Sequence, residues 1–245
     1  MYRNFFYHKY KNTYYIWDDK DGLIESKYEP YAYVVDPKGQ YKTLNGLSVT
    51  KVNSWNKEYE KKGMVFEHDV PVATRVLIDN YFESDEPSTG HRILFFDIEI
   101  EKGIKYSTPA EAYNTITSIA FAFEGKYTCL LLDKNGKLND CVKDIENIGS
   151  VEVKVYRTEE QLLRSFISIW YAIEPTIVSA YNGDYFDVPY LVNRITNVLG
   201  QNAAKKISPI GIIETREVGK DTFIKIAGVA QMDYLQLYKK FTYNQ

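Results

Sequence analysis

Residues 93–100 read Ile-Leu-Phe-Phe-Asp-Ile-Glu-Ile, an apolar run interrupted by two acids. Successive side chains of a β-strand point to opposite faces, so Asp97 and Glu99 share one face of this predicted strand. The other face is apolar and consists of Leu94, Phe96, Ile98 and Ile100. Desolvated carboxylates about 7 Å apart raise each other's pKa and destabilise a fold unless a cation neutralises them. The stretch therefore predicts an amphipathic strand whose acids have a divalent cation as their partner.

The two acids are of the type that binds a hard metal ion. Carboxylate oxygens suit Mg²⁺ or Mn²⁺, and such ions activate water and stabilise the charge that develops when a phosphodiester bond breaks. Glu101 has the same parity along the strand and competes as a ligand, although Lys102-Gly103 indicates that the strand is leaving the sheet there. The alternative is a solvated edge strand whose acids point outward into water. For an Asp-x-Glu taken alone, this alternative is the more common explanation. A metal site needs a further acid from elsewhere in the chain.

A second group of acids follows a short apolar stretch, residues 176–180, which predicts a buried strand. The polar turn after it leads into residues 186–191, Phe-Asp-Val-Pro-Tyr-Leu. Asp187 stands two residues before a proline that can begin a helix, which predicts Asp187 as the N-cap. A carboxylate at the carboxyl end of a central strand can also be a ligand, because α/β sheets place their active sites there. Asp184 is the local rival for that role.

Strand and helix signals alternate after residue 90. Predicted strands cover residues 93–100, 115–123, 126–132, 150–156 and 176–180. Thr158 opens a helix with Gln161 at the spacing of a capping box, and Gly200 closes a second helix that follows the turn after Ala180. Residues 211–227 alternate like a long hairpin, and residues 234–241 predict a terminal helix. This order predicts an α/β fold, a mixed sheet with helices on it.

The first ninety residues predict a smaller, β-rich domain. Short strands at 13–17 and 31–35 are separated by turn signals. A short helix is expected with Asn53 or Ser54 as its N-cap, and another from Pro71 toward residue 78. Residues 83–90 are polar, contain Pro and Gly and have no apolar period, so they are the best linker candidate. We expect the domains to cover residues 1–90 and 91–245.

The composition is that of a folded globular protein and excludes several classes. The 245 residues are 44% hydrophobic and carry a net charge of −3, which argues against a nucleic-acid binder that relies on a basic surface. Cys129 and Cys141 are too few for a disulfide framework or a zinc site. No stretch is apolar enough to span a membrane and the first residues lack the apolar run of a signal peptide, so a cytoplasmic location is expected.

Together the two groups of acids resemble the first two exonuclease motifs of family B DNA polymerases. The first is Phe96-Asp97-Ile98-Glu99, and about ninety residues later comes Tyr181-Asn182-x-x-x-Phe186-Asp187-x-Pro189-Tyr190. The pair is far more specific than either half. Further stretches look like the replicative polymerases of T-even-type bacteriophages, namely Asn193-Arg194-Ile195, Lys206-Ile207-Ser208-Pro209 and Asp233-Tyr234-Leu235-Gln236-Leu237-Tyr238-Lys239-Lys240-Phe241.

The resemblance implies a ribonuclease-H-like exonuclease domain after the β-rich domain. Such a domain would remove mispaired 3′ nucleotides during DNA replication, using two ions of Mg²⁺ or Mn²⁺. The catalytic residues and metal ligands would be Asp97, Glu99 and Asp187. The residues in contact with the single-stranded 3′ end of DNA would be Asn182, Tyr185 and Phe186. The hairpin at 211–227 would correspond to the strand-separating hairpin of the family.

The family's third exonuclease motif, a Tyr with an Asp four residues later, has no counterpart after Asp187. The aspartates there are Asp221 and Asp233, and the residues four positions before them are Glu217 and Val229. The palm, fingers and thumb of a polymerase have no counterpart either. We therefore expect a truncated or naturally split polymerase whose C-terminal polypeptide completes the site. Because a metal site that lacks one ligand loses affinity and geometry, the chain alone should have weak or no nuclease activity.

A non-catalytic module for single-stranded nucleic acid or for assembly is the alternative function. The chain has 22 Tyr and 12 Phe, whose rings could stack on bases, although most aromatic residues of a β-rich chain pack in its core. The basic residues that could contact phosphates are Lys205, Lys206, Arg216, Lys220, Lys225, Lys239 and Lys240. Any one of these residues can equally be an ordinary surface charge that makes no contact with nucleic acid.

Overall fold

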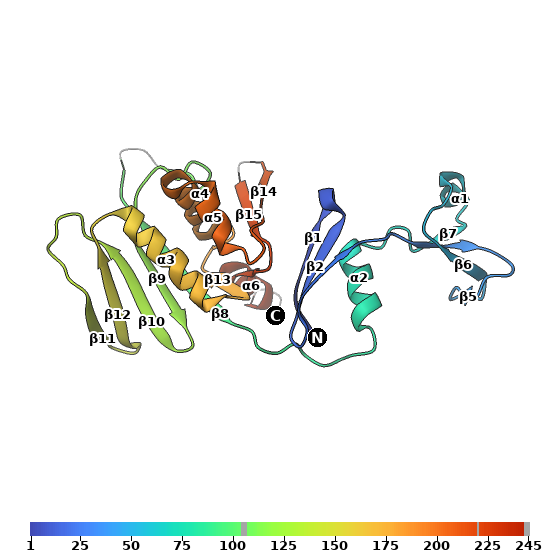
Figure 1. Ribbon diagram of the computed structural model, residues 1–245, viewed down its shortest axis with the longest axis horizontal. Coiled ribbons are helices and arrows are strands. Elements are labelled where there is room, and N and C mark those ends of the chain that lie inside the picture. Colours follow the sequence, from blue (N-terminus) through green and yellow to red (C-terminus); the bar gives the residue numbers. More distant parts are fainter. Residues whose placement is uncertain (104–106, 220, 243–245) are drawn as a thin grey trace. The chain divides into compact units, whose positions relative to one another are not determined.

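A computed structural model of the chain describes residues 1–103, 107–219 and 221–242. It divides into two compact units, Met1–Thr89 and Gly90–Gln245 (Figure 1). No helix within the described part of the chain is long and apolar enough to cross a membrane. Lys220, one of the basic residues considered above, lies outside the described residues.

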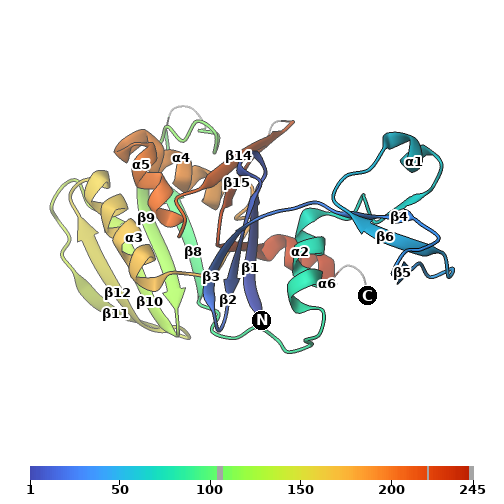
Figure 2. The same cartoon turned by 45° about the vertical axis from the view of Figure 1, so that its right-hand side comes forward.

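The first unit contains two antiparallel sheets. One has the order β1 (Tyr2–His8), β2 (Thr13–Asp18), β3 (Gly22–Lys27), and the other has the order β5 (Tyr41–Lys42), β6 (Ser48–Val52), β4 (Ala32–Val35), β7 (Val65–Phe66). The helical segments are η1 (Lys9–Lys11), α1 (Lys57–Lys61) and α2 (Val72–Tyr81). Helix α2 lies beside β1 (Figures 1 and 2), and the Tyr81 hydroxyl donates to Asp18 at 2.8 Å.

The expected cap of the short helix in this unit is wrong. Asn56, and not Asn53 or Ser54, accepts a hydrogen bond from the backbone N–H of Glu58 at 2.9 Å. The Trp55 indole N–H donates to the Glu60 carboxylate, which fixes Trp55 just outside the helix. Asn and Ser are nearly equal as N-caps, so residue type alone does not decide among Asn53, Ser54 and Asn56. The contact of Trp55 with Glu60 places the start of the helix after Trp55.

The second unit is built on a seven-stranded mixed sheet, which confirms the predicted α/β class. Its order is β11 (Cys141–Ile145), β12 (Gly149–Tyr156), β10 (Lys126–Leu132), β9 (Ile116–Phe123), β8 (Ile93–Ile100), β13 (Ile177–Ala180), β16 (Ala230–Asp233). Strands β8, β13 and β16 are parallel to one another, so their carboxyl ends meet at one edge. Strands β14 (Ile213–Val218) and β15 (Asp221–Ile226) form the separate hairpin. Strands β11 and β16 were not predicted from the sequence.

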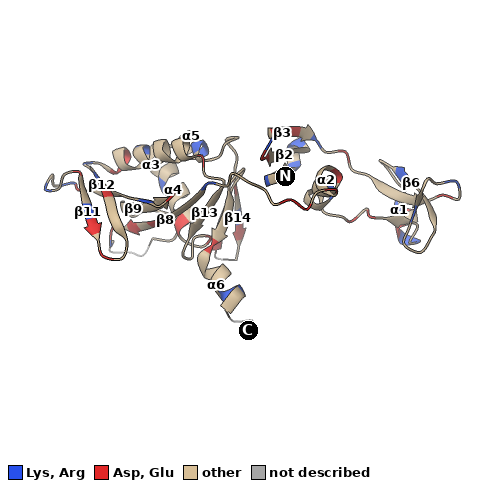
Figure 3. Ribbon diagram, turned by 90° about the horizontal axis from the view of Figure 1, so that it is seen from below, with Lys and Arg blue, Asp and Glu red and all other residues tan. Residues whose placement is uncertain are grey.

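Helices α3 (Glu159–Ile173) and α4 (Asp187–Leu199) pack against this sheet. The short helix α5 (Gln201–Ala204) and the 3₁₀ turn η2 (Lys205–Ile207) follow α4, and α6 (Tyr234–Thr242) follows β16 with no residue of its own buried. Figure 3 shows α3 and α5 along one side of the strands. The capping box of Thr158 and Gln161 is confirmed, and it begins α3. Phe166 and Trp170 of α3 are buried in the same core as Phe96 of β8, so the apolar face of the acidic strand is the one that the helices cover.

A buried ion pair joins α3 to α4. Arg194 donates to both carboxylate oxygens of Glu159, at 2.8 and 2.6 Å, and to the carbonyl of Ala112 at 3.1 Å. Glu159 also accepts the amide of Ile116 at 2.7 Å. The two side chains are 14% and 11% exposed, so either charge would be left buried without the other. This network holds α4 at a fixed height over the strands.

Replacing Arg194 by Ala should destabilise the second unit by about 3 kcal/mol, because Glu159 would stay buried and lose its cation. Unfolding in guanidinium can be followed by Trp170 fluorescence in a background of Trp17→Phe and Trp55→Phe. Arg164→Ala is the matched control, since Arg164 forms an exposed pair with Glu160, and it should change stability by no more than about 0.5 kcal/mol. Equal losses in both variants would contradict the account.

Candidate active site

The acidic strand β8 lies inside the sheet with its acids on the open face. It pairs with β9 from Phe95 to Ile100 and with β13 from Ile93 to Phe95, so it is not an edge strand. Asp97 and Glu99 are both exposed, as are the other residues of their face, Ile93 at 41% and Phe95 at 53%. The expectation that β8 itself desolvates these two acids is therefore wrong. The helices cover only the opposite, apolar face.

Strand β13 stops pairing with β8 before the acids are reached. The last pair in the register is Ser179 with Phe95. Beyond it, the backbone amide of Ile98 donates to the Asp187 carboxylate at 3.2 Å instead. A side chain from the start of α4 thus takes the place that a strand carbonyl would occupy. This substitution brings residues 89 positions apart in the sequence to one point at the carboxyl end of β13.

The turn between β13 and α4 has a conformation that its residues favour. Asn182 has a φ of 61°, in the left-handed region that Asn tolerates better than most residues. Its carbonyl accepts the amides of Tyr185 and Phe186 at 3.2 and 3.0 Å. A Cβ at Gly183 would lie 2.8 Å from the Cβ of Ala180, so this position requires glycine. The Asn-Gly pair therefore sets the sharp return that aims Asp187 at β8.

Asp187 is a buried carboxylate and not the cap of α4. The helix begins at Asp187 itself, Phe186 occupies the N-cap position, and no side chain caps that end, so the N-cap prediction is wrong. The physical reason is that the carboxylate turns to the Ile98 amide in place of its own helix amides. Asp187 is 3% exposed. Burial raises its pKa to about 6, the nearby Asp97 carboxylate adds to the rise, and the Ile98 amide opposes it.

The structure brings Asp97 and Asp187 together and leaves Glu99 beside them. Glu99 lies two residues further along the exposed face of β8. Within the described ranges 1–103, 107–219 and 221–242, no three His, Cys, Asp or Glu residues are grouped so that they could hold a metal ion. Two close carboxylates, one of them buried with a raised pKa, fit a divalent cation as oxygen donors. Glu101 is directed elsewhere, since it pairs with Lys134 at 3.0 Å.

The three residues expected to contact substrate have different surroundings. The Tyr185 side chain is 39% exposed, and its ring meets the Phe223 ring of the β14–β15 hairpin edge-on at 4.9 Å. Phe186 is half-buried and stacks on Tyr190 at 5.4 Å, so it packs against the core. Asn182 is half-buried at the head of the turn. Their contacts with substrate stay a prediction.

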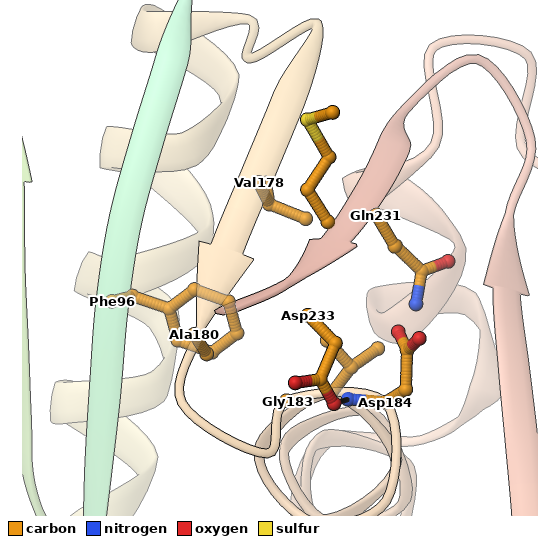
Figure 4. A pocket seen from close by; sticks show the side chains of 9 residues that line it. Phe96, Val178, Ala180, Gly183, Asp184, Gln231 and Asp233 are labelled. Carbon is orange, nitrogen blue, oxygen red and sulfur yellow. Dashed lines mark hydrogen bonds between the residues drawn. The ribbon is translucent and has the colours of Figure 1, made fainter. Parts of the chain in front are cut away.

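One acid of the site was not predicted from the sequence. Asp233 ends β16, and the parallel pairing of β16 with β13 places it opposite Ala180. It is 4% exposed and lines a small pocket with Phe96, Gly183 and Asp184 (Figure 4). Burial raises the pKa of Asp184, and the Asp233 carboxylate adds to that rise. The only local signal in the sequence was an Asp directly before a helix, which is also the common pattern of a cap.

Because the pKa of Asp187 is raised, Asp187→Asn should increase the free energy of unfolding in a pH-dependent way when no divalent metal is present. The pKa of Asp187 in the folded protein, about 6, lies above the ordinary value of 3.8, so the ionised form destabilises the fold. The wild type therefore loses folding stability as the pH rises from 4 through 6. The variant should therefore be more stable than the wild type by about 1–3 kcal/mol at pH 7.5 and equal to it at pH 3.5.

Thermal unfolding at both pH values measures this difference. Asp133→Asn is a control of opposite sign, since hydrogen bonds, first from the Leu138 amide, lower the pKa of Asp133. The ionised form of Asp133 thus stabilises the fold at neutral pH, and its replacement should lower the melting temperature there. If Asp187→Asn left the melting temperature unchanged or lowered it at pH 7.5, that result would contradict the burial of this charge.

Comparison with known proteins identifies the class to which this sheet and these acids belong. Residues 81–245 match the family described as DNA polymerase family B, exonuclease domain. The match covers more than half of the chain, and the chain therefore belongs to this family and carries its exonuclease domain. Exonuclease domains of the family are generally metal-dependent.

Particular relatives are DNA polymerases of phages and archaea. The chain is similar to the DNA-directed DNA polymerase of Escherichia phage RB69, with 26% identity over 89% of this chain and 28% of the relative. It is 36% identical to that of Enterobacteria phage T4 over 36% of this chain and 10% of the relative. A DNA polymerase of Pyrococcus glycovorans is 24% identical over 72% of this chain and 20% of its own length. The chain spans less than a third of each of these relatives.

Proposed function

We propose that the chain is the N-terminal part of a replicative family B DNA polymerase and carries most of its 3′-5′ proofreading exonuclease site. The observation that supports this most directly is the buried Asp187 carboxylate, held on the Ile98 amide beside Asp97. Burial, and to a lesser degree the neighbouring Asp97, raises the pKa of this acid and destabilises its ionised form, and a bound cation would offset that cost. The substrate in this proposal is the single-stranded 3′ end of DNA.

The metal ligands in this proposal are Asp97 and Asp187, with Glu99 as the third. Mg²⁺ or Mn²⁺, two ions in the complete site, would supply Lewis-acid stabilisation of the phosphate charge and lower the pKa of a bound water. The protein's part is to hold the two carboxylates in position. Asp187 is fixed by its hydrogen bond to Ile98, and Asp97 by the pairing of β8 with β9, where it lies opposite Ala120.

Aromatic side chains around the site are suited to hold the bases of a frayed primer end. Tyr181 is 62% exposed and lies next to the ring of Tyr234, at 6.4 Å between centroids. Tyr185 is partly exposed and contacts Phe223 of the β14–β15 hairpin. Exposed rings give single-stranded nucleic acid a stacking surface that tolerates any sequence. In this proposal the hairpin separates the primer end from the template, and Tyr185 connects it to the acids.

A longer polypeptide or a separate C-terminal chain would complete the enzyme. The chain covers 28% of the RB69 relative, which leaves ample length for a third exonuclease motif and for polymerase domains. Helix α6 presents Tyr234, Tyr238 and Phe241 at 52%, 48% and 67% exposure, spaced so that they share one face. An apolar face of this kind favours association, because its burial is favourable. Polymerase activity in this proposal belongs to the complete assembly.

Removal of a site carboxylate should abolish cleavage of a 3′-mismatched primer. In the presence of Mg²⁺ or Mn²⁺ and of the C-terminal polypeptide that completes the site, Asp97→Ala should lower the cleavage rate at least about 100-fold, because the metal that stabilises the phosphate charge loses a ligand. Glu101→Ala is the matched control on the same parity of the strand, and it should stay within about twofold, since that side chain pairs with Lys134. A wild-type rate for Asp97→Ala would overturn the proposal. Salt-sensitive binding without cleavage under any condition would favour a non-catalytic binding module.

Addition of the C-terminal polypeptide should raise the nuclease rate of the chain, by about 10-fold or more, because the third motif supplies a missing ligand. The measurement compares single-turnover cleavage by the chain alone with cleavage after mixing, and gel filtration shows whether the two associate. Asp187→Asn mixed with the same polypeptide should associate and remain inactive. Association without any gain in rate would contradict the split-enzyme part of the proposal.

A further inference from the structure

Asp233 connects two elements that meet at the proposed site. One carboxylate oxygen accepts the backbone amide of Asp184 at 3.2 Å, and the other accepts the amide of Gln236 in the first turn of α6 at 3.2 Å. The first of these amides lies in the turn that carries Asp187, and the second lies in the next helix along the chain. At 4% exposure, Asp233 is almost fully withdrawn from water.

The amide of Asp184 is the point at which this turn is held from outside. The neighbouring amides are held from within, because Tyr185 and Phe186 donate to the Asn182 carbonyl and Val188 donates to the Gly183 carbonyl. Those bonds define the shape of the turn but not its position relative to the sheet. The bond from Asp184 to Asp233 supplies that position, since Asp233 is part of β16 (Figure 4).

Strand β16 is held by its pairing with β13 and by a side-chain contact with β15, which makes Asp233 a firm anchor. It pairs with β13 from Ile177 with Ala230 to Ala180 with Asp233. On the other side the Gln231 amide group donates to the Ile224 carbonyl at 2.8 Å and accepts the Ile226 amide at 3.2 Å. The anchor is therefore continuous with the β14–β15 hairpin as well as with the sheet.

We propose that Asp233 is a positioning residue of the exonuclease site, which fixes the turn 182–187 and thereby holds the Asp187 carboxylate on the Ile98 amide beside Asp97. This inference rests on the proposed function, because it concerns the same site. In this role the residue acts through the backbone, because each of its oxygens accepts an amide hydrogen bond from a neighbouring element. Through Gln236, the position of α6 is tied to the same geometry.

Aspartate is the side chain that this position requires. Two amides from different directions each need an acceptor, and a carboxylate offers one oxygen to each. An asparagine has one acceptor oxygen and would turn its NH₂ group toward the other amide, so one of the two bonds must be lost. Asp233→Asn is therefore a nearly isosteric variant that removes the double acceptor while keeping the shape.

Three measurements on the full-length chain test the proposal with Asp233→Asn. Amide hydrogen exchange in peptides that cover residues 181–187 should accelerate at least about 10-fold, because the turn loses its anchor. The dissociation constant for Mn²⁺, measured by calorimetry, should rise about 10-fold. With the complementing polypeptide, kcat on a 3′-mismatched primer should fall about 10- to 100-fold while KM for DNA stays within about twofold.

Asp133→Asn is the matched control. Asp133 is also a buried aspartate after a strand of the same sheet, and it accepts the amides of Asn135 and Leu138 at 3.1 and 2.6 Å. It should lower the melting temperature and leave exchange at 181–187, Mn²⁺ affinity and kcat unchanged. Equal effects of both variants on these three readouts would overturn the proposal, since they would reflect general destabilisation. Wild-type exchange at 181–187 in Asp233→Asn would overturn it as well.

The outcomes separate this proposal from the proposed function. If Asp97→Ala binds Mn²⁺ as the wild type does, the metal site is wrong, and the exchange measurement still decides whether Asp233 anchors the turn. If Asp97→Ala loses Mn²⁺ binding while Asp233→Asn keeps wild-type exchange and Mn²⁺ affinity, the site stands and the positioning role of Asp233 is wrong.

Discussion

The hydrogen bond from the Ile98 amide to the Asp187 carboxylate is the constraint on which the site depends. It exists because β13 pairs with β8 only as far as Phe95, which leaves the next part of β8 to be satisfied by a side chain. A carboxylate does this at a cost, because burial and a neighbouring acid raise its pKa to about 6. The fold thus keeps an acid where a neutral acceptor would destabilise it less, which is the feature on which the proposed function rests.

The parallel part of the sheet gathers the remaining features around that bond. Strands β8, β13 and β16 run in one direction, so Asp97, the turn after Ala180 and Asp233 reach the same edge. Crevices at the carboxyl ends of such strands are where α/β proteins bind ligands. The chain belongs to the exonuclease domain family of family B DNA polymerases by its sequence, and its parallel strands place these acids where such a crevice lies.

Local sequence signals predicted the elements well where the interactions that form them are local. The capping box of Thr158 with Gln161 and the strand at 126–132 were read directly from residue order. Strands β11 and β16 were missed, because their residues give no strong alternation and become strands by pairing with β12 and β13. Asp187 was expected to be a cap, since its sequence neighbours give no sign that the Ile98 amide, 89 positions away, is its partner.

The sequence by itself determined the α/β class, the alternation that puts Asp97 and Glu99 on one face of β8, and the Asn-Gly turn, because strand periodicity and backbone preference act between near neighbours. Only the tertiary structure decided that this face is open to solvent, that Asp187 and not Glu101 joins Asp97, and that Asp233 holds the turn in place. Those outcomes depend on which strands pair and where the pairing stops, and that is set by packing between segments far apart in the chain.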